Sequence, residues 1–195
     1  MSSLRASLMP GVTGARHELA KTLERNFNEV EMALIAGRIM VKIAVVRPSF
    51  ALEFFRFSYQ ALFNDRIART TRIFDKRKDA RNFWRVKKDR PALVSNALVR
   101  HSIDLPALID FADRLKHVRD HTVAHISLLS VLDSRSIWQR AGIKAIELQK
   151  ALMAARRVFS HVYRAEFGVD FPDIDYRAGD VRPIIKAGIA AGIID

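Results

Sequence analysis

The segment from Arg119 to His125 carries the side-chain types that can cleave a phosphodiester bond without a metal ion. A guanidinium can hold a phosphate, and an imidazole can move a proton near neutral pH. Asp120, directly after the arginine, can orient the guanidinium or fix the tautomer of the histidine. Because the chain has 33 Lys and Arg against 21 Asp and Glu, a net charge of +12, we expect it to attract polyanions, and RNA first among them.

The spacing between Arg119 and His125 sets a geometric problem. On a straight helix these two side chains would point about 120° apart, so they would not hold one phosphate together. The two groups would meet if the helix ends near Thr122, if the arginine curls toward the histidine, or if a second copy of the chain completes the site. The competing interpretation is that Arg119 pairs with Asp113 or Asp120 at the surface and that His125 lies half-buried after the helix.

Two other groups have spacings that suggest a function. Asp65 and Arg69 are four positions apart, so they form either an ordinary helix-stabilising ion pair or a supporting pair beside the site. His117, His121 and His125 also repeat every four residues, which is the spacing of helical zinc ligands. The chain has no cysteine and lacks the glutamate of the zinc-protease helix, so we expect no metal. His121 then lies either on the solvated surface or beside the site in a supporting role.

The segment 65–90 is strongly basic, with 11 Lys and Arg against 4 Asp, and carries seven of the twelve net positive charges. Phe83 and Trp84 lie within it and would either stack on RNA bases or pin the segment to the core, and we favour pinning. The candidate RNA-binding cations are Arg66, Arg72, Lys76, Arg77, Lys78, Arg81, Arg85, Lys87 and Lys88.

Hydrophobic periodicity predicts an all-α protein, a bundle of four to five helices with long antiparallel members. The predicted helices cover 15–46, 49–74, 91–123 with a break near Pro106, 143–167, and a short one at 181–191. Residues 75–90 are predicted to form a polar connection, Asp104 a helix cap and Gly168 a helix end. The expected core positions are Leu19, Leu23, Phe27, Val30 and Leu34 in the first helix, and Leu52, Phe55, Tyr59, Leu62, Phe63, Ile67 and Phe74 in the second.

The chain is predicted to form one domain at residues 15–168, with an N-terminal tail at 1–14 and a C-terminal extension at 169–195. The first residues lack the apolar core of a signal peptide. The most apolar stretch, residues 32–46, contains Arg38 and Lys42 and is too short to span a bilayer. Together with the lack of cysteine, these features lead us to expect no membrane span and a cytoplasmic location.

Two short motifs resemble the HEPN superfamily (higher eukaryotes and prokaryotes nucleotide-binding domains). The segment LKHVRDHTVAHIS matches its signature of an arginine, a polar residue, a short gap and a histidine, here Arg119, Asp120 and His125. The stretch DRIARTTRIFD at 65–75 resembles a helix end of the abortive-infection AbiU-like branch. The resemblance covers about residues 20–168 and leaves the last 25 or so outside it.

This resemblance implies a helical homodimer in which the motifs of two protomers form one cleft. Many members are metal-independent endoribonucleases that need no cofactor, and they act as toxins with an antitoxin or in phage defence. The resemblance implies catalytic roles for Arg119, His125 and Asp120, and a supporting role for Asp65 and Arg69. Any nucleotidyltransferase activity would belong to a separate partner chain. The alternatives are a non-catalytic HEPN module that binds RNA, a nucleotide or a partner protein, and a purely structural interaction protein.

Overall fold

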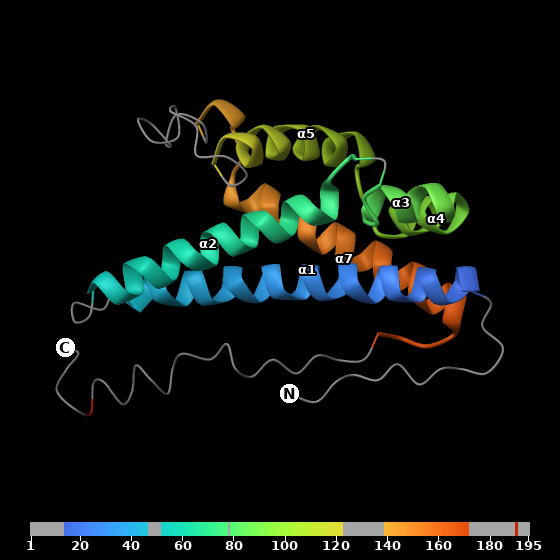
Figure 1. Cartoon of the computed structure of the whole chain (residues 1–195), viewed down its shortest axis with the longest axis horizontal. Helices are drawn as coiled ribbons and strands as arrows, with labels where there is room; N and C mark the ends of the chain where they lie inside the picture. The colour runs from blue at the N-terminus through green and yellow to red at the C-terminus, as the bar shows by residue number, and fades with distance from the viewer. Residues whose placement is uncertain (1–13, 47–51, 78, 123–138, 172–189, 191–195) are drawn as a thin grey trace.

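The computed structural model describes residues 14–46, 52–77, 79–122, 139–171 and 190. Across these ranges the chain forms helices and short connections, with no β-strand, so the all-α prediction is confirmed. The helices are α1 (Gly14–Val46), α2 (Leu52–Phe74), α3 (Phe83–Asp89), α4 (Pro91–Arg100), α5 (Leu105–Thr122) and α7 (Ala145–Phe167). Figure 1 shows α1 and α2 running antiparallel, α7 crossing both, and α5 lying over α2.

The core lies where α1, α2 and α7 meet. All five predicted core residues of α1 are buried, which confirms that its apolar stripe faces the bundle. Burying a large aliphatic or aromatic side chain contributes about 1.5–3 kcal/mol, so this stripe is a main source of stability. Complete burial of Leu152 and Phe159 shows that α7 supplies the opposite wall.

The second half of α2 joins this core, but its first half does not. Ile67 and Phe74 are buried as predicted, whereas Tyr59 is 38% exposed, so its assignment to the core is wrong. In Figure 1 the first half of α2 lies along the end of α1, away from α4 and α5. Phe54 and Phe57 are therefore 66% and 72% exposed, because no other described helix covers this end.

The predicted connection at 75–90 contains the short helix α3, which the sequence analysis missed. Asn82 begins it, since its side-chain oxygen accepts a hydrogen bond from the Trp84 backbone N–H at 3.2 Å. Phe83 is fully buried, and the Trp84 indole N–H donates to the carbonyl of Phe74 at 2.8 Å. Both aromatic residues therefore pin the basic segment to the core, as predicted.

The break in the third predicted helix is confirmed by the separate helices α4 and α5. Pro91 occupies the first turn of α4, where its missing N–H costs nothing. Asp104 caps α5, because its Oδ1 atom accepts from the Ala107 backbone N–H at 3.1 Å. Gly168 ends α7 with a left-handed φ of 73°, as its position predicted.

Several predictions fall outside the described residues. These are His125, the side chain of His121, Lys78, the first-turn residues of the helix predicted from 49, and the helix predicted at 181–191. In the part of the chain that is described, no helix combines the length and the apolar character needed to cross a membrane.

Candidate functional site at the junction of α2 and α5

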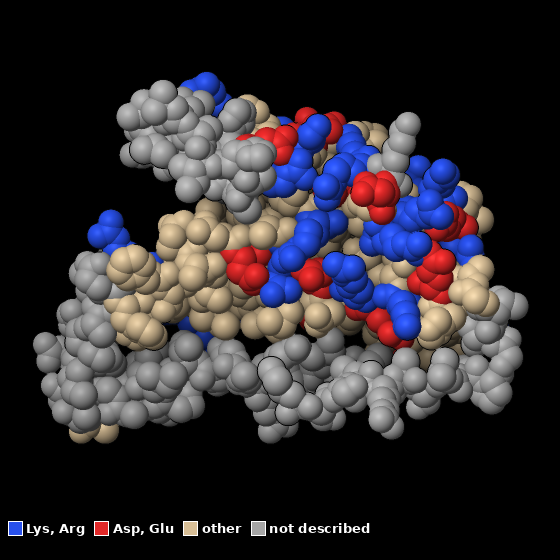
Figure 2. All heavy atoms as spheres, viewed as in Figure 1, with Lys and Arg blue, Asp and Glu red and all other residues tan. Residues whose placement is uncertain are grey.

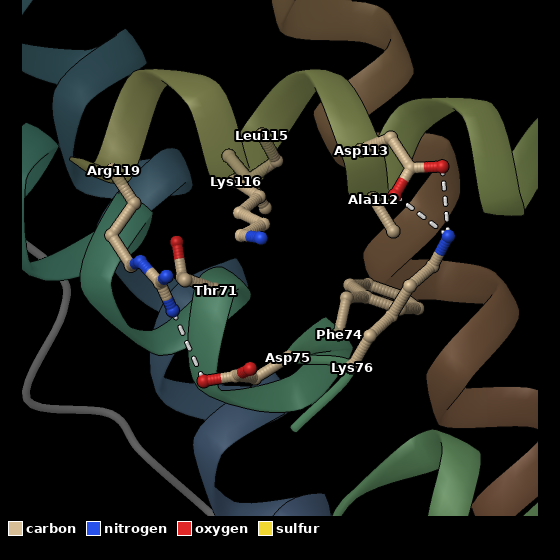
Figure 3. A pocket seen from close by; sticks show the side chains of 9 residues that line it. All are labelled: Thr71, Phe74, Asp75, Lys76, Ala112, Asp113, Leu115, Lys116 and Arg119. Atoms are coloured by element: carbon tan, nitrogen blue, oxygen red, sulfur yellow. Dashed lines mark hydrogen bonds and ion pairs between the residues drawn. The ribbon is translucent and has the colours of Figure 1, made fainter. Parts of the chain in front are cut away.

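Arg119 lies on the last described turn of α5, and its guanidinium reaches the end of α2 (Figure 3). Its Nη1 atom donates to Oδ2 of Asp75 at 3.0 Å. Its Nε and Nη2 atoms both donate to Oδ1 of Asp120, at 2.7 and 2.5 Å. The Asp75 side chain is only 8% exposed, against 41% for Asp120. The guanidinium is therefore held from two directions, by a buried carboxylate of a neighbouring element and by its own chain neighbour.

A small pocket lies beside Arg119, between α2 and α5. Lys76 closes one end of it by donating to both carboxylate oxygens of Asp113, at 2.7 and 2.8 Å. Figure 3 shows Lys116 pointing from α5 toward α2 between these two links, with the Thr71 hydroxyl opposite. Three cationic side chains and the carboxylates of Asp75 and Asp113 thus line a pocket of about 10 Å³, which has room for about one water molecule.

The carboxylates do not use all the donors of Arg119. A guanidinium has five N–H groups, of which one belongs to Nε and two to each terminal nitrogen. The bonds to Asp75 and Asp120 occupy Nε and one N–H on each terminal nitrogen. One N–H on Nη1 and one on Nη2 therefore remain for a phosphate oxygen, while the group stays fixed.

The structure resolves the competing interpretation of Arg119 in part. Arg119 pairs with Asp120, one of the two predicted partners, whereas Asp113 pairs with Lys76 instead. His125 lies outside the described residues, and so does the side chain of His121. The meeting of the arginine and the histidine therefore stays a prediction.

Asp65 and Arg69 form the predicted pair, with Nε donating to Oδ2 at 2.7 Å. Arg69 also donates to Glu29 of α1 at 3.2 Å, so this pair ties α2 to α1. The hydrogen bond that Arg69 donates to Asp65 is the main cause that raises the pKa of Arg69. Neither residue is bonded to Arg119 or to its carboxylates in the described contacts, so the structure does not bring these two groups together.

The basic segment faces solvent, but many of its cations are paired. Figure 2 shows Lys and Arg gathered on this face together with Asp and Glu. Such exposed pairs contribute about 0–1 kcal/mol, so a phosphate can replace the carboxylate at little cost. Among the described residues, Lys87 and Lys88 form no ion pair. The pairs are Arg72–Glu29, Lys76–Asp113, Arg77–Asp75, Arg81–Glu18 and Arg85–Asp89.

Arg66 is the RNA-binding prediction that the structure contradicts, because the residue is only 8% exposed. Its guanidinium lies against Gly37 of α1, where an added Cβ atom would stand 2.7 Å from Cζ. Nη2 donates to Oε1 of Gln149 on α7 at 2.8 Å, and Nε has no partner. Burial lowers the pKa of Arg66, against a smaller opposite effect of Tyr59. This buried cation has no ion pair in the described structure.

Sequence reasoning missed the role of Asp75 at this site. The residue ends the motif DRIARTTRIFD, but nothing in that motif indicates that its carboxylate meets an arginine 44 positions later. Lys116 and Thr71 were also missed as pocket residues, because their spacing from Arg119 carries no signal across two helices. The only signal in the sequence was an aspartate, Asp75, directly after a basic helix.

The described residues form an all-helical bundle with a small pocket at the junction of α2 and α5, lined by basic and acidic side chains. Within the described ranges, no group of three or more His, Cys, Asp and Glu side chains is arranged to hold a metal ion. No family model, no curated protein and no solved structure matches the chain. The resemblance to HEPN domains therefore rests on the residues of the two motifs.

Proposed function

We propose that this chain is a homodimeric, metal-independent endoribonuclease of the HEPN type. In this proposal it acts in the cytoplasm as a toxin or a phage-defence component. The observation that carries it is the anchored guanidinium of Arg119, which keeps two N–H donors beside Lys116 and Lys76. A pre-positioned cation in such a pocket is suited to stabilise the negative charge that develops on a phosphate.

In the proposed reaction, the RNA 2′-hydroxyl oxygen attacks the adjacent phosphorus atom. If His125 is the general base it accepts the hydroxyl proton, and the leaving 5′-oxygen takes its proton from water. If protonated His125 is instead the general acid it supplies the proton to the leaving 5′-oxygen, and water takes the hydroxyl proton. The new P–O bond forms as the bond to the 5′-oxygen breaks, giving a 2′,3′-cyclic phosphate and a 5′-hydroxyl. Arg119 stabilises the charge on the phosphate oxygens, while Asp75 and Asp120 hold it in place.

The direct test compares the wild-type chain with Arg119→Ala and His125→Ala on labelled RNA in EDTA. Each substitution is expected to lower the cleavage rate by about 10²- to 10³-fold. Arg164→Ala is the matched control, because Arg164 is an exposed arginine paired with Asp170 and lies outside the predicted RNA-binding segment 65–90. It should cleave within about twofold of wild type. If the wild type does not cleave, or if both active-site variants cleave normally, the proposal fails.

Mixing the two inactive variants tests whether the site is shared between subunits. A mixed dimer would contain one intact site if Arg119 of one subunit works with His125 of the other. Cleavage should therefore return when the variants are mixed and refolded together, and a site within one chain would give no recovery.

Antitoxin or nucleotidyltransferase partners would be sought by expressing the active chain in a bacterium and selecting for restored growth.

The second candidate is a non-catalytic HEPN module that binds RNA, a nucleotide or a partner protein. The pairing of Arg119 with two carboxylates favours it, because these compensate the charge that would stabilise a transition state, while the basic segment 65–90 still attracts polyanions. This candidate predicts RNA binding that weakens steeply with salt and is not followed by cleavage.

A further inference from the structure

A second, larger pocket lies between the first half of α5 and the middle of α7. It forms a groove of about 590 Å³ and shares no lining residue with the pocket beside Arg119. The groove exists because α5 packs mainly on α2, while α4 packs on α7. Its volume is within the range of about 300–1,000 Å³ that is typical of small-molecule sites.

The floor of this groove is apolar. Leu108 and Phe111 of α5 face Ala151 and Ala154 of α7, and all four residues are buried. Met153 adds a partly buried, adaptable side chain along α7. The small alanine side chains leave the space open, so the body of a ligand would be in contact with hydrocarbon and an aromatic ring.

One end of the groove carries basic side chains that form no ion pair with a carboxylate of the described residues. Arg157 of α7 and His101 at the end of α4 line it, with Arg100 and His161 nearby. The pKa of His101 is lowered first by burial, then by the positive charges of Arg157 and Arg100 and by His161. The dipole at the C-terminus of α4 favours Arg100 and His101, but it does not account for Arg157 and His161 on α7.

The carboxylates of the groove are already engaged elsewhere. Asp104 caps α5 through the Ala107 N–H. Glu147 accepts from Arg114 Nη2 at 2.9 Å and from the Lys144 backbone N–H at 2.7 Å. The hydrogen bond from Arg114 is the main cause that lowers the pKa of Glu147. In the contacts of the described residues, neither carboxylate is bonded to Arg157 or His101.

We propose that this groove binds a small organic anion with an apolar body. Its acidic group contacts Arg157 and His101, and its body lies on Phe111, Leu108 and Ala154. The basic end supplies the charge complementarity, and the apolar floor supplies the area removed from water. This site is independent of the ribonuclease proposal, because it uses none of the residues around Arg119.

The test titrates the full chain with the fluorescent aromatic sulfonate 1-anilinonaphthalene-8-sulfonate, followed by competition with phenyl phosphate, octanoate and inorganic phosphate. Saturable binding of one dye per chain is expected. Ala107→Trp fills the groove from an exposed position, and Arg157→Gln removes the exposed cation, so each should weaken binding at least tenfold. Phenyl phosphate or octanoate should compete, and inorganic phosphate should not.

Two control variants locate the dye. Arg164→Gln removes a cation from the same helix outside the groove, and Phe57→Ser removes the most exposed aromatic side chain of α2. Both should bind the dye within about twofold of wild type. Loss of binding in Phe57→Ser, or unchanged binding in Ala107→Trp and Arg157→Gln, would overturn the proposal. So would equal competition by inorganic phosphate, or displacement of the dye by RNA alone.

Discussion

Arg119 and Arg66 are two arginines of the same bundle in opposite electrostatic surroundings. Arg119, with a 21% exposed side chain, donates three hydrogen bonds to two carboxylates. Arg66, an 8% exposed residue, donates one to the amide of Gln149 and leaves Nε without a partner. Residue type alone therefore does not distinguish an arginine that carboxylates hold at a candidate site from an arginine whose burial lowers the stability of the fold.

The same contrast extends along the two sides of α5. On the side of α2, Lys76 and Arg119 of the pocket meet Asp113, Asp75 and Asp120. On the side of α7, Arg157 and His101 at the basic end of the groove form no ion pair within the described part of the chain. Removing a partner from a paired charge is costly, whereas replacing a buried unpaired charge with an apolar group is often neutral or favourable. The free energy of unfolding of single variants measures the difference between these paired and unpaired charges.

The largest effect is expected for Asp75→Ala. This change removes the acceptor of Arg119 Nη1 and of the Arg77 backbone N–H and Nε. Hydrogen bonds to charged groups contribute about 1.5–3 kcal/mol, so we expect a loss of about 2–3 kcal/mol in the free energy of unfolding, measured in urea. Asp79→Ala, an exposed change in the same connection, should stay within about 0.5 kcal/mol of wild type. Equal values for the two variants would contradict the anchoring role of Asp75.

A smaller change, of opposite direction, is expected for Arg66→Met. The thioether fills part of the same volume and removes a buried cation, so stability should be unchanged or higher by up to about 1 kcal/mol. Arg72→Met is the matched control, because Arg72 has a 53% exposed side chain and pairs with Glu29. A loss of more than about 2 kcal/mol in Arg66→Met would show that its bond to Gln149 outweighs the cost of burial.

The smallest effect concerns pH and the basic end of the groove. His101 faces Arg100 from its own element and Arg157 and His161 from α7, and its folded-state pKa is lowered. The unfolded chain therefore binds a proton at higher pH than the folded chain, so stability falls as pH drops below about 6.5. Urea unfolding at pH 7.5 and 5.5 should show this fall, and His101→Gln should reduce it. An identical pH dependence in both chains would contradict this assignment.

Much of the fold could be predicted because it follows from local pattern. The apolar stripe of α1, the break at Asp104 and the stop at Gly168 each depend on residues within a turn or two of one another. The helix α3 was missed because its start depends on Asn82 in a polar segment that has the composition of a loop. Ser102 has a φ of 50°, a left-handed conformation that the presence of a serine does not predict.

The helical class, the positive charge and the adjacent pair Arg119 and Asp120 all follow from the order of residues along the chain. The packing of distant helices, in contrast, places Asp75 against Arg119, buries Arg66 over Gly37 and opens a groove with a basic end between α5 and α7. The difference lies in the sequence separation over which each interaction acts. Helix periodicity and capping act over a few residues, whereas the charge around a guanidinium depends on which distant elements pack against it.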